Sequence, residues 1–101
     1  MLDKRVIVFS GVDWHHGVVG IVAARCMEKF GRPVFLMSRN RGDTEVRGSA
    51  RSFGGFSIFK ALSFAADTLT KFGGHSGAGG FSLTEENIPL FDEKLQEFAH
   101  G

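Results

Sequence analysis

The stretch KFGGHSGAGG at residues 71–80 crowds five glycines around one histidine, His75. Glycine loses more conformational freedom on folding than any other residue, so such a cluster needs a compensating role. Glycines on both sides of His75 expose backbone N–H groups and leave the imidazole as the one large side chain. An imidazole in that setting can donate to a phosphate oxygen or transfer a proton. Although a lone histidine is more often structural, we interpret this stretch as a place where the backbone approaches a ligand.

A second candidate is RGSARS at residues 47–52. Alternation along a strand places Arg47, Ser49 and Arg51 on one face, and Gly48, Ala50 and Ser52 on the other. Two guanidinium groups with a hydroxyl between them suit a phosphate, because arginine presents a planar fork of donors. The small residues allow close packing on the opposite face. The alternative is an edge strand whose arginines are solvated and prevent aggregation.

The third candidate is DWHHGVVG at residues 13–20, between an expected strand and an expected helix. Such junctions are favoured ligand positions in open α/β sheets. However, the dinucleotide fingerprint G-x-G-x-x-G is missing. In the structural alternative, Trp14 covers the sheet edge and the glycines permit close helix packing. His15 and His16 are poor metal ligands, because adjacent side chains diverge and no cysteine lies nearby.

Enzymes that cut phosphodiesters usually hold two metal ions with several carboxylates and histidines. The acidic residues before position 85 form no D-H-H or D-x-D cluster; they are Asp3, Asp13, Glu28, Asp43, Glu45 and Asp67. The sequence therefore predicts no metal centre within this chain.

These candidates need a scaffold, and the hydrophobic pattern predicts one α/β domain over residues 1–101. Gly31 stands where a helix ends, Ser57 is a good N-cap, and Gly73 is placed as the C′ residue of a helix. We expect a mixed sheet of about four or five strands with a βαβ unit and three helices. The expected strands cover 5–10, 33–38, 44–52 and 80–83, and the expected helices 17–30, 58–72 and about 87–99.

Composition is typical of a globular domain, with 43% hydrophobic and 23% charged residues. Residues 1–84 hold 11 Lys or Arg against 6 Asp or Glu, whereas residues 85–101 hold 1 against 5. The basic first part permits an anionic partner, although one acidic helix beside a solvated face explains the charge equally well. The single cysteine, Cys26, fits a reducing compartment, and no apolar run is long enough for a membrane span, so we expect a cytoplasmic location.

With WHHGVVGIVAAR, RGSARS and KFGGHSGAGG in this order, the sequence resembles the DHH-associated domain of the DHH phosphoesterase superfamily, and more closely that of RecJ-type single-stranded-DNA-specific exonucleases. The resemblance covers about residues 5 to 100. It implies a fragment whose upstream DHH domain binds two manganese or magnesium ions, with single-stranded DNA lying in the cleft between the two domains. The parent enzyme would act in DNA repair and recombination.

The resemblance also implies roles for individual residues. Ser49 and Arg51, within the segment Gly48–Ser52, are expected to contact phosphate. His75 is expected to reach the scissile phosphate, with Gly73 and Gly74 allowing close approach. The chain departs from the family pattern at His16, where proline is usual, and at Ala78–Gly80, where A-A-G is usual.

Other functions stay open at this point. The chain could be the equivalent domain of a DHH phosphodiesterase that degrades short oligonucleotides or cyclic dinucleotides. It could also be a complete small enzyme acting on nucleotides, or a module that binds only protein. The segment W-H-x-G-V-x-G favours the RecJ type.

Overall fold

The chain forms one five-stranded mixed sheet with helices on both faces, as seen in a computed structural model that describes residues 6–12, 15–40 and 42–100. The described strands follow the order β1-β2-β3-β5-β4; β1 and β2 are parallel, and the other pairs are antiparallel. This confirms the predicted fold class. The elements are β1 (Ile7–Val12), α1 (His16–Phe30), β2 (Val34–Arg39), β3 (Glu45–Arg51), α2 (Ile58–Phe64), β4 (Lys71–Gly74), β5 (Ala78–Thr84) and α3 (Ile88–His100), with short 3₁₀ turns at Ala66–Thr68 and Glu85–Asn87.

The first three elements form the predicted βαβ unit. Helix α1 ends at Gly31, which adopts the left-handed conformation (φ 65°) and donates its N–H to the Met27 carbonyl. Glycine enters this region without the steric cost that other residues incur, so Gly31 ends the helix as predicted. None of the described helices is long and apolar enough to cross a membrane.

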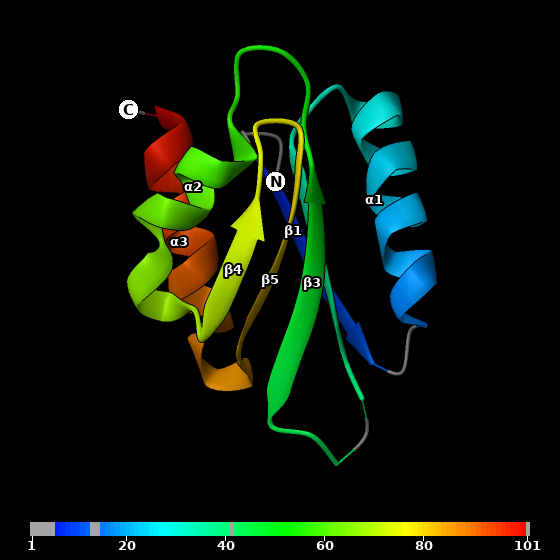
Figure 1. Cartoon of the computed structure of the whole chain (residues 1–101), viewed down its shortest axis with the longest axis vertical. Helices are drawn as coiled ribbons and strands as arrows, with labels where there is room; N and C mark the ends of the chain where they lie inside the picture. The colour runs from blue at the N-terminus through cyan, green and yellow to red at the C-terminus, as the bar shows by residue number, and fades with distance from the viewer. Residues whose placement is uncertain (1–5, 13–14, 41, 101) are drawn as a thin grey trace.

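Helices lie on both sides of the sheet (Figure 1), and the buried apolar side chains form two clusters. Helix α1 lies on one side of the sheet, where Val19 and Ala23 pack against Val34 and Leu36. Helices α2 and α3 lie on the other side and cover the larger core, which includes Phe35, Met37, Phe81, Leu62, Phe91 and Leu95.

Close contact between β3 and β5 depends on a buried glycine. A Cβ added at Gly48 would lie 2.6 Å from the Leu36 carbonyl oxygen and would overlap the Phe81 ring. Phe81 in turn packs against Phe91, with ring centroids 5.1 Å apart. The prediction that small residues on this face of β3 permit close packing is confirmed, and the packing partner is Phe81.

One predicted element was wrong. The helix expected over 58–72 ends at Phe64; a 3₁₀ turn follows, and then strand β4. Ser57 caps the helix as predicted, accepting from the Lys60 N–H. Gly73 is not the C′ residue but lies within β4, paired with Gly80. The other predicted elements exist, with ends shifted by one to two residues.

The acidic end of the chain lies on the side of the sheet that α1 does not cover. Glu93 and Glu97 of helix α3 are exposed to solvent. Some of the charge is neutralised locally: Lys94 Nζ lies 3.1 Å from Asp67, and Arg39 Nε lies 3.2 Å from Glu85.

Two glycine substitutions test whether close packing requires glycine at Gly48 but not at Gly80. Gly48→Ala should lower the free energy of unfolding by about 1–3 kcal/mol, because the methyl group must displace Phe81 or a backbone carbonyl. Gly80→Ala is the matched control: its Cβ would lie 3.7 Å from the Gly48 carbonyl oxygen, an ordinary contact, so we expect a change below about 0.5 kcal/mol. Urea unfolding followed by circular dichroism measures both, and equal losses in the two variants would contradict this account of the packing.

Candidate nucleic-acid interface

The sheet carries a polar surface beside α1. In antiparallel strands, directly paired residues share a face. Strand β3 presents Ser49 and Arg51 toward α1, so their partners on β5 and β4 lie on that side too. We call this surface the open face, because α1 packs against β2 and β3 while Lys71, Gly73 and Gly80 are exposed. Its residues are Arg47, Ser49, Arg51, Ala78, Gly80, Ser82, Lys71 and Gly73.

Arg51 occupies a defined position between β3 and α1. Its Nη1 donates to the Ala50 carbonyl at 2.7 Å. A Cβ added at Gly20 would lie 2.9 Å from Arg51 Nη2 and 3.9 Å from Ser49 Oγ. Gly20 therefore makes room for the guanidinium group beside the Ser49 hydroxyl, which links DWHHGVVG to RGSARS.

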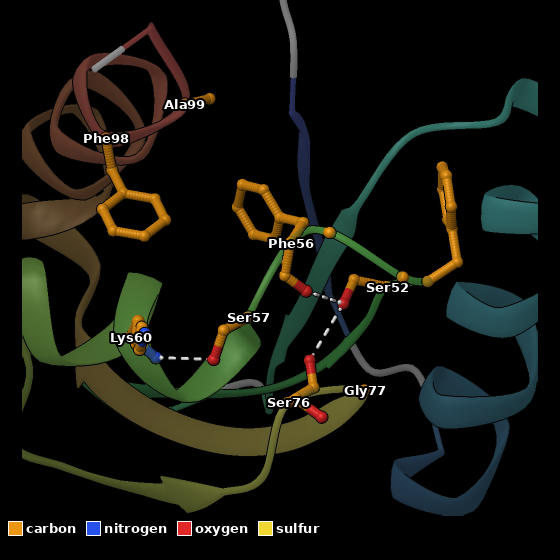
Figure 2. Close-up of a pocket in the computed structure, with 11 residues that line it drawn as sticks. Ser52, Phe56, Ser57, Lys60, Ser76, Gly77, Phe98 and Ala99 are labelled. Atoms are coloured by element: carbon orange, nitrogen blue, oxygen red, sulfur yellow. Dashed lines mark hydrogen bonds between the residues drawn. The ribbon is translucent and has the colours of Figure 1, made fainter.

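Ser52 connects two loops at one end of the sheet through hydrogen bonds (Figure 2). Its hydroxyl lies 2.7 Å from the Phe56 carbonyl oxygen and 3.0 Å from the Ser76 carbonyl oxygen. The Ser52 N–H donates to the Gly77 carbonyl at 2.9 Å. The loop at 52–57 is thus fastened to the hairpin at 75–77, beside a cavity of about 680 Å³ that Phe98 and Ala99 of α3 also line. The Ser52 hydroxyl proton serves these carbonyls, and its predicted phosphate contact stays a prediction.

His75 lies at the tip of the β4–β5 hairpin with an exposed side chain. Its Nδ1 accepts from the Gly77 N–H at 3.1 Å. In the neutral ring the proton is therefore on Nε2, which is a donor. The Phe59 N–H donates to the His75 carbonyl at 3.2 Å, and this fixes the hairpin tip against the start of α2.

The five glycines around His75 have different reasons to be glycine. Gly74 has φ 144°, and an added Cβ would lie 2.5 Å from the Ala78 carbonyl. A Cβ added at Gly79 would lie 2.9 Å from Ile58 Cγ2. Gly73 has open space at the Cβ position and Gly80 only an ordinary contact, so packing within this domain does not demand glycine at either. The prediction of close ligand approach therefore fits Gly73 better than Gly74.

Arg51 and His75 lie at the same end of the sheet, since Arg51 pairs with Ala78 and the hairpin tip follows directly. The guanidinium lies near Gly20 of α1, and the imidazole Nδ1 accepts from the Gly77 N–H. Between them lie Ala78 and the bond that joins Ser52 to Gly77. Whether both contact one phosphate stays a prediction.

The third candidate, DWHHGVVG, has a structural role in the described part of the chain. The His15 side chain caps α1, with Nδ1 accepting from the Gly17 N–H at 3.2 Å. Trp14 lies outside the described residues. Within those residues, no group of three His, Cys, Asp or Glu side chains could hold a metal ion, so the donor set does not suit a metal centre here.

Sequence reasoning missed Lys71, Gly80 and Ser82 as members of this surface. Lys71 was assigned to a helix end, which hid its pairing with Ser82 across β4 and β5. Strand alternation at 80–83 was the available signal, because it separates Gly80 and Ser82 from Phe81.

Similar proteins identify the family. The model of the DHHA1 domain matches residues 3–101. The single-stranded-DNA-specific exonuclease RecJ of Bacillus subtilis is 40% identical over 98 residues, which cover 97% of this chain and 12% of that protein. The Escherichia coli RecJ is 43% identical over 90 residues, covering 84% of this chain and 15% of the relative. The chain thus spans about an eighth to a seventh of these relatives.

Solved structures agree. Thermus thermophilus RecJ in complex with Mg²⁺ superposes with a TM-score of 0.86 and 37% identity, covering 96% of this chain and 15% of that one. An exonuclease RecJ bound to manganese gives 0.85, covering 97% of this chain and 24% of that one. The C-Ala domain of Aquifex aeolicus alanyl-tRNA synthetase shares the fold alone, with a TM-score of 0.70 at 12% identity and 93% coverage of both chains. Sequence and fold together show that this chain belongs to the DHHA1 domain family.

Proposed function

We propose that this domain binds the phosphate backbone of single-stranded DNA as the substrate-binding part of a RecJ-type exonuclease that acts in DNA repair and recombination. The observation that carries the proposal is the position of Arg51. Its guanidinium lies beside Ser49 and Gly20, and it forms no ion pair with any described acidic residue. An arginine without an anionic partner, next to a hydroxyl, suits a phosphate oxygen pair.

His75 supports the same assignment from the neighbouring hairpin. An exposed imidazole whose Nδ1 accepts from Gly77 presents Nε2–H as its free donor. In this proposal that donor reaches the scissile phosphate, and Gly73 leaves room for the strand. Ser52 and Gly48 act indirectly: Ser52 fastens the loops and Gly48 sets the β3–β5 contact.

Hydrolysis itself belongs to another part of the polypeptide in this proposal. Solved RecJ structures are described as complexes with Mg²⁺ or manganese, and the described residues here offer no cluster of donors for either ion. We place the metal ions in an upstream DHH domain of the same polypeptide. This chain would then position the strand.

The equivalent domain of a DHH phosphodiesterase acting on short oligonucleotides or cyclic dinucleotides is the other candidate. The relatives named above favour the RecJ type, because they match at 40% and 43% identity. A preference for long single strands over dinucleotides would support RecJ.

Arg51→Ala should weaken binding of a fluorescent oligothymidylate by roughly 10- to 150-fold, the loss of one charge-assisted hydrogen bond. Arg51→Lys should not restore it, because an ammonium group cannot present a planar fork. Fluorescence anisotropy at fixed ionic strength measures both. Arg25→Ala, at an exposed position of α1, is the matched control and should bind like the unchanged chain. Unchanged affinity in Arg51→Ala would return Arg51 to a solvated role at the sheet.

The chain alone should not degrade single-stranded DNA in the presence of Mn²⁺ or Mg²⁺, because the donors among its described residues form no group that could hold a two-metal centre. Gel electrophoresis of a labelled strand after incubation measures this. Metal-dependent digestion that co-purifies with the chain and is lost in His75→Ala would refute the proposal that hydrolysis belongs to another domain of the polypeptide.

His75→Ala, made in a full-length RecJ-type polypeptide containing this domain, should lower kcat more than it raises KM. This follows if the Nε2 contact strengthens only as charge develops on the scissile phosphate. Steady-state kinetics separate the two parameters, with His100→Ala near the end of α3 as the matched control. An increase in KM with kcat unchanged would assign His75 to ground-state binding instead.

A further inference from the structure

The pair Gly73–Gly80 forms a bare patch of backbone in the middle of the open face. The two residues are directly paired across β4 and β5, and Ser49 continues the row on β3. Both glycines are exposed, and neither has a positive φ. Space exists for a side chain at Gly73, so glycine is not explained by contacts inside the domain. A flat, side-chain-free surface of this kind suits close approach of another molecule.

The next row along the strands is basic. Arg47, Ser82 and Lys71 are paired across β3, β5 and β4. The outer two are exposed and form no ion pair among the described residues, unlike Arg39 and Lys94. Neighbouring strands lie about 4.8 Å apart, so the Cα atoms of Arg47 and Lys71 are about 10 Å apart. Their long side chains can converge on one anion above Ser82.

Ser82 points to this surface and is only 3% exposed. Its carbonyl accepts from the Thr70 N–H at 2.8 Å. A shallow groove of about 210 Å³ lies here, lined by Lys71, Phe72, Gly73, Gly80, Phe81 and Ser82.

We propose that this groove is a second subsite for the DNA strand, in which Lys71, with Arg47 beside the groove, binds an internucleotide phosphate above Ser82, and the neighbouring Gly73–Gly80 pair leaves room for the strand. The inference rests on the proposed function, because it extends the same strand from Arg51 across the open face. Arg51 lies four positions after Arg47 along β3, a distance of about 13 Å. The second phosphate therefore belongs to a different nucleotide, and a ligand with a single phosphate cannot occupy both subsites.

Ligand length gives the test. In ¹⁵N–¹H NMR titrations of the chain, thymidine 5′-monophosphate should shift amide signals near Arg51 only. An octathymidylate should also shift the signals of Gly73, Gly80 and Ser82. Because NMR detects millimolar binding, an absence of shifts with the octamer would overturn both this subsite and the proposed function.

Two variants sharpen the test. Lys71→Ala should weaken octamer binding about tenfold and reduce the salt dependence by about one phosphate contact, without affecting the monophosphate. Gly73→Val should fill the groove and weaken octamer binding at least as much. Its melting temperature should not fall, because the new side chain enters open space on a strand. Lys29→Ala, at the far end of α1, is the matched control.

The outcomes separate the two proposals. If Arg51→Ala weakens binding while Lys71→Ala and Gly73→Val do not, the second subsite is wrong and the proposed function stands. If Lys71→Ala and Gly73→Val weaken the monophosphate and the octamer equally, the groove is part of the first phosphate site and the second subsite is also wrong.

Discussion

The antiparallel pairing of β3 with β5 determines what each face of the sheet can do. Because side chains alternate, the register that buries Gly48 beneath Phe81 also turns Ser49 and Gly80 outward together. A slip of one residue would bring Arg47 or Arg51 into the core that contains Phe81 and Phe91. An unpaired charge buried there would cost several kcal/mol, so the apolar core and the polar surface enforce the same register.

Helix α1 adds a second constraint from the other side. Gly20 lies close enough to Arg51 that any side chain at this position would displace the guanidinium group or the helix. The position of the arginine is thus set by strand β3, which carries it and supplies the Ala50 carbonyl that accepts its hydrogen bond, and by helix α1 above it. Side chains held in this way lose less conformational freedom on binding, which favours a fixed phosphate geometry.

Local signals predicted much of this structure, and long-range pairing accounts for the part they missed. Gly31, Ser57 and the alternation of RGSARS follow from the conformations of single residues, and the sequence reveals them. The helix expected to continue to residue 72 fails because Lys71–Gly74 gains a partner in β5 and Phe72 packs near Phe59, with ring centroids 6.1 Å apart. The apolar spacing at 65 and 69 fits a helix, but local spacing carries no information about such tertiary contacts. The same pairing creates the surface around Lys71, so this part of the site could not be predicted from the sequence. The contact between Arg51 and Gly20 was not predicted either, because it also depends on long-range packing between residues 31 positions apart.

The separation of charge between the two layers has a kinetic consequence. Arg47, Arg51 and Lys71 on the open face form no ion pair with the described acidic residues, whereas α3, which carries the exposed Glu93 and Glu97, lies on the other side of the sheet (Figure 1). A net charge of only +1 therefore hides a dipole across the sheet. Such a dipole orients an approaching polyanion before contact, so that encounters with the open face are more frequent than the net charge suggests. Added salt would slow association chiefly by removing this orientation, while the short-range contacts that govern dissociation would change less.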